Sequence, residues 1–231
     1  VYDSSFYIEG GRGVGLLAEG ETANLSPANV KVTTRGESGL GAFAEAGAKM
    51  QVSDSSFSTS GLGASGLLAS GTGSQLDAAR VQVHTTGGAL DGRGAHGVEA
   101  QFGAKLSVTG ASTVQTEGDG AIGALAQTSP NLPNGPTQLS LDGGSDKVRV
   151  QTSGANAFGV AAAGAQARVD LNSVDASTSG EGSFGLYARG DGASIGGKSV
   201  SVSTAGGDTA AIAAVLGGQV ELSGSTVDAA G

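Results

Sequence analysis

The sequence predicts an all-β protein folded as a right-handed, three-faced parallel β-helix of about eight to nine coils. The first observation is a repeat, because a glycine that closes a short strand-like segment recurs nine times, at intervals of 25 to 36 residues. These glycines are Gly10, Gly36, Gly61, Gly87, Gly118, Gly154, Gly180, Gly206 and Gly231. Threonine stands two residues before seven of them. A regular period of this length is typical of a solenoid, in which each repeat packs on its neighbours.

The second observation is an alternation of apolar residues within each repeat, which is the period of a β-strand. The first strand of a repeat contains a second glycine, usually five residues after the closing one. Around it, Val14-Leu16-Ala18 and Phe158-Val160-Ala162 represent residues that we expect on the inner face. The third inner position is alanine in all eight repeats: Ala18, Ala44, Ala69, Ala100, Ala126, Ala162, Ala188 and Ala214.

The second and third strands of each repeat show the same period, with polar residues on the opposite face. Ala48-Met50-Val52 represents the second strand and Val30-Val32-Thr34 the third. Three strands in about 25 residues favour a β-helix over a β-propeller, whose blades need four strands in about 40–45 residues. We expect the repeated threonines to point inward or to lie at a corner of the coil, and to hydrogen-bond to one another along the stack.

Composition excludes several classes of protein. The chain carries 43 glycines without a strict every-third pattern, which excludes collagen. Its formal net charge of −9 argues against nucleic acid and anionic membrane surfaces as partners. No apolar run approaches the roughly 18 residues of a membrane-spanning helix. We expect one β-helical fragment over residues 1–231, with no signal peptide and no β-barrel translocator, and with stacking in place of disulfides because cysteine is absent.

Two repeats are longer than the others and locate insertions. The first adds five residues within 88–96, and the second adds about ten, which we place at 128–137. The second insertion holds Pro130, Pro133 and Pro136. Insertions in solenoids form loops on one side of the molecule, often the binding side.

The residues offer no constellation for catalysis or metal binding. His84 is expected on the polar face of a third strand and His96 at an inner position of a first strand. Metal-site spacings of histidine and cysteine, a nucleophile elbow and a phosphate-binding loop are all missing from the sequence. Asp142 and Asp146 lie close together, but the outward positions show no column of carboxylates of the kind that polysaccharide-cleaving β-helices need. We therefore predict no enzymatic activity and no cofactor.

Two features predict a contact surface. The outer position of the first strand is apolar in most coils, reading Leu17, Phe43, Leu68, Glu99, Leu125, Ala161, Tyr187 and Ala213. Large exposed apolar patches usually mark interaction sites, although a covering loop or a neighbouring domain would also explain this one. Arg189-Gly190-Asp191 is a tripeptide that integrins recognise on exposed turns, and it follows the same strand. A chance occurrence is the alternative for so short a motif.

Repeats such as GAFAEAGAKMQVSDSSFSTSG from Gly41 to Gly61 and FGVAAAGAQARVDLNSVDASTSG from Phe158 to Gly180 resemble the passenger domains of Gram-negative autotransporters, the type V secretion systems. The resemblance is strongest to the pertactin-like group and covers essentially the whole chain. It implies a passenger that is exported through the periplasm and displayed on the outer membrane by a separate C-terminal β-barrel. Such passengers are typically adhesins, and pertactin displays an Arg-Gly-Asp loop that Arg189–Asp191 matches in type.

The sequence thus leads us to expect an adhesin that binds a host matrix or cell-surface molecule, with an integrin as one candidate. Self-association in aggregates or biofilm is the alternative, and a polysaccharide-active enzyme is a more remote one. The apolar outer positions belong to the strand that precedes both the 128–137 insertion and the Arg189–Asp191 turn. We therefore predict that one edge of the rod, carrying all these features, is the working surface.

Overall fold

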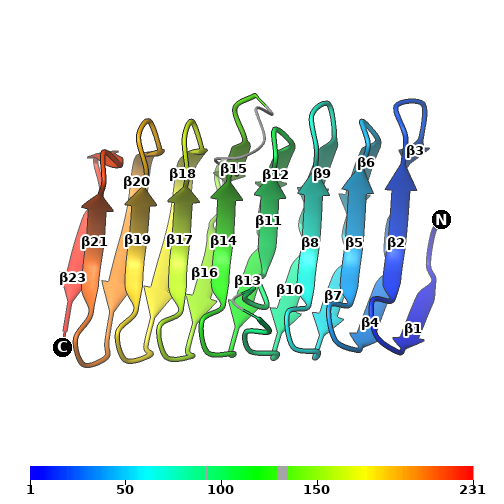
Figure 1. Ribbon diagram of the computed structural model, residues 1–231, viewed down its shortest axis with the longest axis horizontal. Helices are drawn as coiled ribbons and strands as arrows, with labels where there is room; N and C mark the ends of the chain where they lie inside the picture. Colours follow the sequence, from blue (N-terminus) through cyan, green and yellow to red (C-terminus); the bar gives the residue numbers. More distant parts are fainter. Residues whose placement is uncertain (92, 130–134, 231) are drawn as a thin grey trace.

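The computed structural model describes residues 1–91, 93–129 and 135–230, which form a rod of stacked coils that contains strands and turns but no helix (Figure 1). Every neighbouring pair of strands in it is parallel and in register with the next coil, as in a β-helix of about eight coils. In Figure 1 the near strands run upward, the chain returns on the far side, and successive coils advance from right to left. This path is right-handed, as expected for parallel crossover connections.

One face of the rod is an eight-stranded sheet, here called sheet B. Its strands are β2 (Val14–Glu19), β5 (Leu40–Glu45), β8 (Ser65–Ser70), β11 (Val98–Gln101), β14 (Ile122–Gln127), β17 (Phe158–Ala163), β19 (Phe184–Arg189) and β21 (Ala210–Val215).

The other two faces form one fifteen-stranded sheet, because two long strands run through the corner between them. The long strands are β18 (Arg168–Thr178) and β20 (Ser194–Thr204). The second face also holds β3 (Asn24–Leu25), β6 (Lys49–Ser53), β9 (Gln75–Ala79), β12 (Lys105–Thr109), β15 (Gln138–Asp142) and β22 (Gln219–Ser223). The third face also holds β1 (Ser5–Glu9), β4 (Lys31–Arg35), β7 (Ser56–Thr59), β10 (Gln82–Thr85), β13 (Thr113–Thr116), β16 (Val148–Thr152) and β23 (Thr226–Ala229).

The core is a set of columns in which like residues stack on like. The alanine column predicted from the sequence is buried from Ala18 to Ala188, and only Ala214, in the last described coil, is exposed. Leu16, Leu67, Val98 and Leu186 belong to a neighbouring buried column. Most buried residues are alanine, valine and leucine, and Phe57 and Met50 are the largest side chains that are fully buried.

The repeated glycines occupy positions where one coil touches the next. A Cβ atom on Gly87 would overlap the carbonyl oxygen of Gly61, and one on Gly118 would overlap that of Gly87. The same contact recurs at Gly36, Gly61, Gly154, Gly180 and Gly206. The period read from the sequence is therefore a column of backbone-to-backbone contacts that exclude any side chain.

The repeated threonines are buried, as expected, but the predicted hydrogen bonds between them are absent. Except in Thr85, whose Oγ1 donates to the Ala95 carbonyl at 3.3 Å, their hydroxyls have no hydrogen-bond partner. The reason is spacing, because equivalent atoms of neighbouring coils are separated by about 4.8 Å and a hydroxyl bond needs about 2.8 Å.

The longer of the two insertions is split between two corners of the rod, which corrects its prediction as a single loop. Ten residues separate Gln127 from Gln138, whereas four separate their partners Ala163 and Arg168. Five residues then separate Asp142 from Val148, whereas Ser173 alone separates their partners in β18. The first insertion has the five additional residues expected, between β10 and β11.

Candidate binding face on the concave sheet

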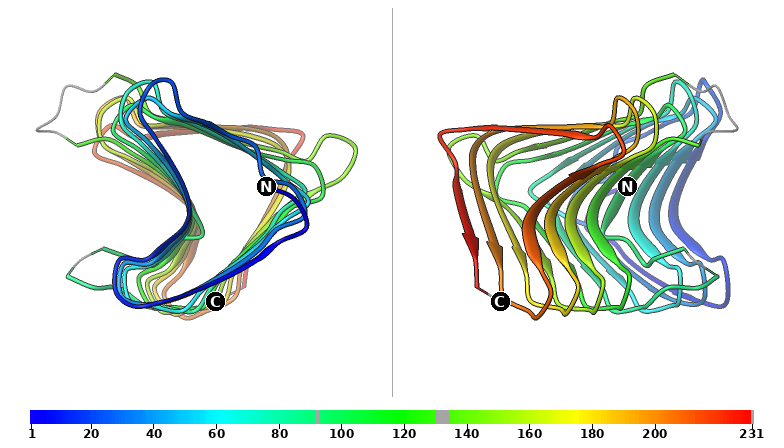
Figure 2. Two further views of the ribbon diagram at one scale, coloured as in Figure 1. Left: turned by 90° about the vertical axis from the view of Figure 1, so that its right-hand side faces the viewer. Right: turned by 60° about the vertical axis from the view of Figure 1, so that its left-hand side comes forward.

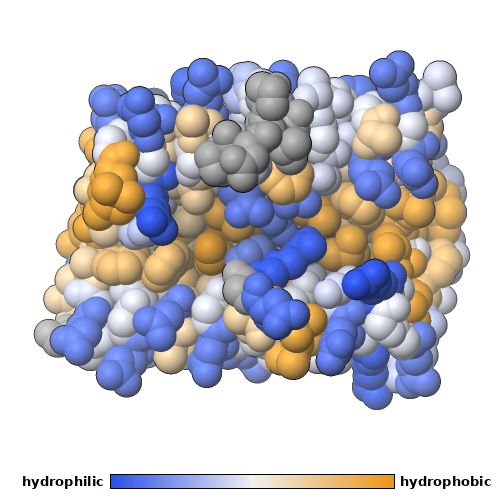
Figure 3. Space-filling view, in the orientation of Figure 1, coloured by the Kyte–Doolittle hydropathy of each residue, from blue (hydrophilic) through white to orange (hydrophobic). Residues whose placement is uncertain are grey.

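The strands of sheet B bow toward the axis of the rod, so their outer side forms a concave face along its length (Figure 2). An apolar band follows this face and is interrupted near the middle by hydrophilic side chains (Figure 3). Each complete strand directs its first, fourth and sixth residues outward, as Phe184, Tyr187 and Arg189 do in β19. We call the surface made by these three outward columns the concave face.

The first outward column was expected inside, and this expectation was wrong. Phe158 and Phe184 pack against the outward Tyr187, and Val14, Ile122, Phe158 and Phe184 are all partly exposed. The glycine that follows them causes the change. A Cβ on Gly185 would overlap the buried Val202 side chain, so Gly185 and Leu186 both face inward and the alternation shifts by one. The ladder pairing omits this glycine, as at a bend in the strand.

The predicted apolar column lies on the concave face, but its exposure varies along the rod. The Leu17 side chain is 46% exposed, and Phe43 and Tyr187 are partly exposed. In contrast, Leu68 and Leu125 point outward yet are only 2% exposed. Leu17 lies on the terminal strand of sheet B, whereas Leu68 and Leu125 each lie between two neighbouring strands. The accessible apolar surface is therefore divided into two parts.

An aromatic cluster forms the accessible apolar surface toward the C-terminal end. The ring centroids of Phe158, Phe184 and Tyr187 lie 4.8 to 5.4 Å apart, with Phe184 and Tyr187 stacked at an interplanar angle of 18°. Such offset and tilted arrangements suit the charge distribution of aromatic rings. The cluster is thus held rigidly by its own contacts while all three rings remain partly exposed.

A buried carboxylate interrupts the apolar band in the middle of the face. Glu99 is only 1% exposed, although it occupies the outward position between Leu68 and Leu125. Its Oε1 accepts a hydrogen bond from Gln127 Nε2 at 3.0 Å. Its Oε2 accepts one from Ser65 Oγ at 3.4 Å and lies 3.7 Å from Arg93 Nη2. A buried charge needs such compensation, because desolvation penalises it strongly.

His96 lies beside this carboxylate and supports the insertion that carries Arg93. The histidine is 6% exposed and on the outer side of the sheet, whereas the sequence pattern placed it inside. Its Nδ1 accepts the backbone N–H of Ile122 at 3.1 Å. Burial lowers the pKa of His96; the charge of Glu99 raises it and that of Arg93 lowers it again. The imidazole is therefore neutral at neutral pH, with its remaining proton on Nε2.

The first insertion and the 128–137 part of the longer one connect to opposite ends of sheet B strands, so they border the concave face on opposite sides in the end-on view (Figure 2). The 88–96 segment contains an isolated bridge between Leu90 and Arg93, which carries the arginine to Glu99. In the other insertion, Thr128 Oγ1 donates to the Ala165 carbonyl at 2.7 Å and Thr137 Oγ1 donates to that of Gln127 at 3.1 Å. Of its predicted contact residues, Pro136 is exposed, and Pro130 and Pro133 lie outside the described residues.

The Arg189-Gly190-Asp191 tripeptide forms a tight turn within a row of similar turns. Gly164 N–H donates to the Arg189 carbonyl at 2.8 Å, and Gly190 N–H donates to that of Val215 at 3.3 Å. Its backbone is therefore tied to the coils on both sides, while the side chains of Arg189 and Asp191 are exposed. Arg189 is also the last outward residue of β19, so its side chain belongs to the concave face.

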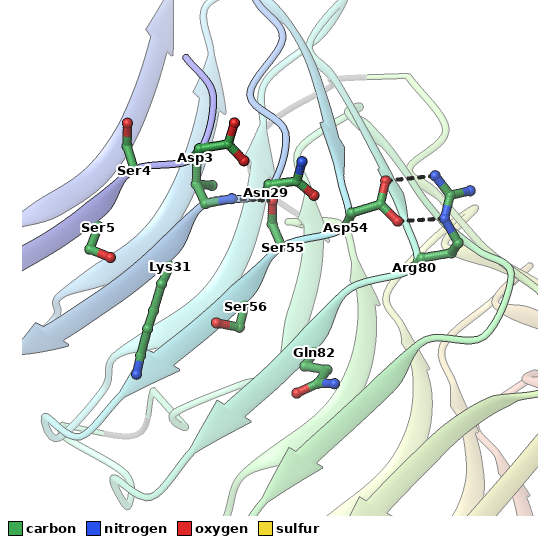
Figure 4. A pocket seen from close by; sticks show the side chains of 11 residues that line it. Asp3, Ser4, Ser5, Asn29, Lys31, Asp54, Ser55, Ser56, Arg80 and Gln82 are labelled. Atoms are coloured by element: carbon green, nitrogen blue, oxygen red, sulfur yellow. Dashed lines mark hydrogen bonds and ion pairs between the residues drawn. The ribbon is translucent and has the colours of Figure 1, made fainter.

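A polar groove of about 500 Å³ lies at the corner between the other two faces (Figure 4). It is lined by residues such as Asn29, Lys31 and Gln82, and Arg80 forms a two-pronged ion pair with Asp54 at 2.6 and 2.7 Å. Asp54 and Arg80 are both largely exposed, and the pair lowers the pKa of Asp54. The groove is shallow and solvated, so it offers a partner less desolvation than the concave face.

The acidic pair noted in the sequence does not form a reactive site. Asp142 Oδ1 accepts hydrogen bonds from Gly144 N–H at 2.9 Å and Asn172 Nδ2 at 2.8 Å, so it serves the local turn. Lys147 pairs with Asp175 at 2.8 Å, and Asp146 is exposed.

Within the described residues, no group of histidine, cysteine or acidic side chains is arranged to hold a metal ion. The same residues contain no helix long and apolar enough to cross a membrane.

No family model, no curated protein and no solved structure matches this chain. The fold is therefore established by the structure itself, and the function has to be argued from the concave face.

Proposed function

We propose that this chain is the rod-like passenger part of a surface-displayed adhesin, which binds a host extracellular-matrix or cell-surface molecule along the concave face. In this proposal the protein is exported through the periplasm and held at the outer membrane by a separate β-barrel. An integrin is one candidate partner, through Arg189 and Asp191.

One observation supports the proposal most strongly. Leu17, Phe43 and the aromatic cluster keep apolar surface accessible on a concave face, whereas the outward residues of the third face, such as Lys31, Gln82 and Arg149, are polar. Desolvated aromatic side chains supply much of the binding energy in protein interfaces. A long face also allows several weak contacts to act together, which suits adhesion.

The same geometry disfavours self-association as the main activity. Two concave faces cannot fill one another, and a net charge of −9 on each copy opposes their approach. A slender partner seated in the hollow avoids both problems. Sedimentation at high protein concentration tests this alternative, and a monomer is the expected result.

The proposal is tested by adhesion of chain-coated beads to cultured cells and to matrix-coated plates. A variant with Phe43→Ser and Tyr187→Ser removes apolar contacts from both parts of the concave face. Its matched control, Lys31→Ser with Arg149→Ser, changes the third face. We expect the first variant to lose most adhesion and the control to retain it, with unchanged melting temperatures. Adhesion that survives in the first variant and disappears in the control contradicts the proposal, and Asp191→Ala measures the share due to an integrin.

A further inference from the structure

We propose that the polar groove at the corner between the second and third faces binds an extended chain of neutral, β-linked sugars (Figure 4). The groove is separate from the concave face, so the inference goes beyond the proposed function and does not rest on it. Three features of the groove support it: its direction along the rod, its unpartnered polar side chains and its balanced charge.

The groove runs along the rod, because equivalent residues of four consecutive coils line each of its two walls. One wall is the corner row, in which every residue has a left-handed backbone with φ between 47° and 54°: Asp3, Asn29, Asp54 and Arg80. The other wall is the strand row, whose members pair in register on the third face: Ser5, Lys31, Ser56 and Gln82. Figure 4 shows the two rows side by side.

The spacing of these rows suits an extended sugar chain. Neighbouring coils are about 4.8 Å apart, so the wall residues repeat at that distance along the groove. A chain of β-linked sugars in its extended form advances by a similar distance per sugar. Successive sugars can therefore meet successive coils.

Most polar side chains of the two walls have no partner among the described residues. Asn29, Lys31 and Gln82 form no side-chain hydrogen bond or ion pair there, whereas Asp54 and Arg80 pair with each other at 2.6 and 2.7 Å. The groove thus presents free acceptors and free donors on opposite walls. A sugar hydroxyl both donates and accepts hydrogen bonds, so a row of hydroxyls can use both walls at once.

The charge and polarity of the lining favour a neutral sugar over an anion or a peptide. Two carboxylates, of Asp3 and Asp54, are balanced by two cations, of Lys31 and Arg80, so the lining carries no formal net charge. The net charge of −9 on the whole chain also disfavours an anionic ligand. Val30 is the one apolar residue of the lining and is only 2% exposed. The groove therefore has no accessible apolar pocket of the kind that anchors a peptide.

The experiment titrates the purified chain with cellohexaose, β-mannohexaose and xylohexaose and follows the sugars by NMR. The groove is shallow and solvated, so we expect weak binding of at least one oligomer, with a Kd on the order of 1 mM. Glucose spans a single coil and should bind too weakly to detect. A hexapeptide of serine and glycine tests whether any polar chain binds, and it should not.

Two substitutions in the groove should weaken binding of the oligomers. Lys31→Ala removes an ammonium donor, and Asn29→Gly removes an amide while keeping a left-handed φ that glycine adopts freely. We expect each to lower the affinity roughly three- to tenfold. Arg149→Ala is the matched control, because Arg149 is an exposed cation in the column of Lys31 but outside the groove. Thermal melting verifies that each variant is folded.

The inference is overturned if none of the three oligomers binds, if glucose or the hexapeptide binds equally well, or if Lys31→Ala and Arg149→Ala cause an equal loss. The proposed function is tested separately by Phe43→Ser with Tyr187→Ser. This double variant should bind the oligomers like the unsubstituted chain, even where it loses cell adhesion. If it loses oligomer binding as well, the sugars lie on the concave face and the groove is not their site.

Discussion

The inner and outer sides of the eight strands of sheet B differ, because only the inner side holds a column in which the same residue repeats from coil to coil. The inner column is alanine in every coil, whereas the outer column changes from Leu68 to Glu99 to Leu125 in consecutive coils. Contacts between coils at about 4.8 Å spacing constrain the inside and leave the outside free to vary.

This difference teaches where function is to be sought in such a fold. Residues that repeat in every coil are needed for stacking. Residues that depart from the repeat indicate a feature of one coil alone. Glu99, the first insertion and the 128–137 part of the longer one lie on or beside the concave face, whereas the 143–147 part lies at the corner between the other two faces. The comparison predicts that substitutions inside the rod change stability strongly, while those outside change it less and act mainly on binding.

The largest effect is expected from Gly87→Ala, inside the stack. The new methyl group would overlap the Gly61 carbonyl, so two coils must separate. Overpacking of this kind costs roughly 1–3 kcal/mol, occasionally more. Urea unfolding measures the loss, and Gly207→Ala is the matched control because its Cβ would meet nothing within 4 Å. Equal midpoints for the two variants would show that backbone contact between coils does not explain the glycine repeat.

An intermediate effect is expected from Arg93→Gln on the concave face. The substitution removes the cation beside the buried Glu99 carboxylate, which keeps only its hydrogen bonds from Gln127 and Ser65. Loss of one partner of a buried polar group costs about 1–3 kcal/mol. Arg80→Gln breaks a shorter ion pair, but both partners there are largely exposed, so we expect a smaller loss. Adding Glu99→Gln should restore the stability of Arg93→Gln. The comparison fails if Arg80→Gln is the more damaging variant in urea unfolding.

The smallest effect is a dependence of stability on pH through His96. Because burial lowers its folded pKa below the ordinary value of about 6.5, stability is fully present above that pH and falls as the pH drops toward the folded pKa. Protonation also turns Nδ1 into a donor, which breaks the bond from Ile122 N–H. We expect the difference in melting temperature between about pH 7.5 and about pH 5 to shrink in His96→Asn. If this difference in melting temperature is unchanged in His96→Asn, groups other than His96 cause the pH dependence.

The sequence predicted the fold well because its strongest signals come from contacts that repeat. The T-x-G spacing and the alanine column each report the same interaction many times, so the strands and most of the core follow from them. The repeats that contain the insertions could be predicted for the same reason. The division of the longer insertion between 128–137 and 143–147 could not. Residue counts between glycines cannot say at which corner the additional residues leave the coil.

The candidate site was only partly predictable. The outer apolar column and the single charged residue within it, Glu99, were visible in the sequence, but its partners Arg93 and Gln127 come from an insertion and from another coil. The outward turn of Phe158 and Phe184 was missed because simple alternation ignores the bend at the adjacent glycine. The burial of Leu68 and the exposure of Leu17 likewise cannot be predicted from a pattern of period two, because they depend on which strands lie beside each residue.

The most direct test of the central claim is protection of single cysteines from a thiol reagent, since the chain has no cysteine of its own. Ala163→Cys places a thiol on the concave face, and Ser177→Cys places one on the third face, both at partly exposed positions. Labelling is measured with the chain free and then bound to the cells to which it adheres. The account predicts severalfold protection of the thiol in Ala163→Cys and little change in Ser177→Cys. Equal protection of both, or protection of Ser177→Cys alone, would contradict it.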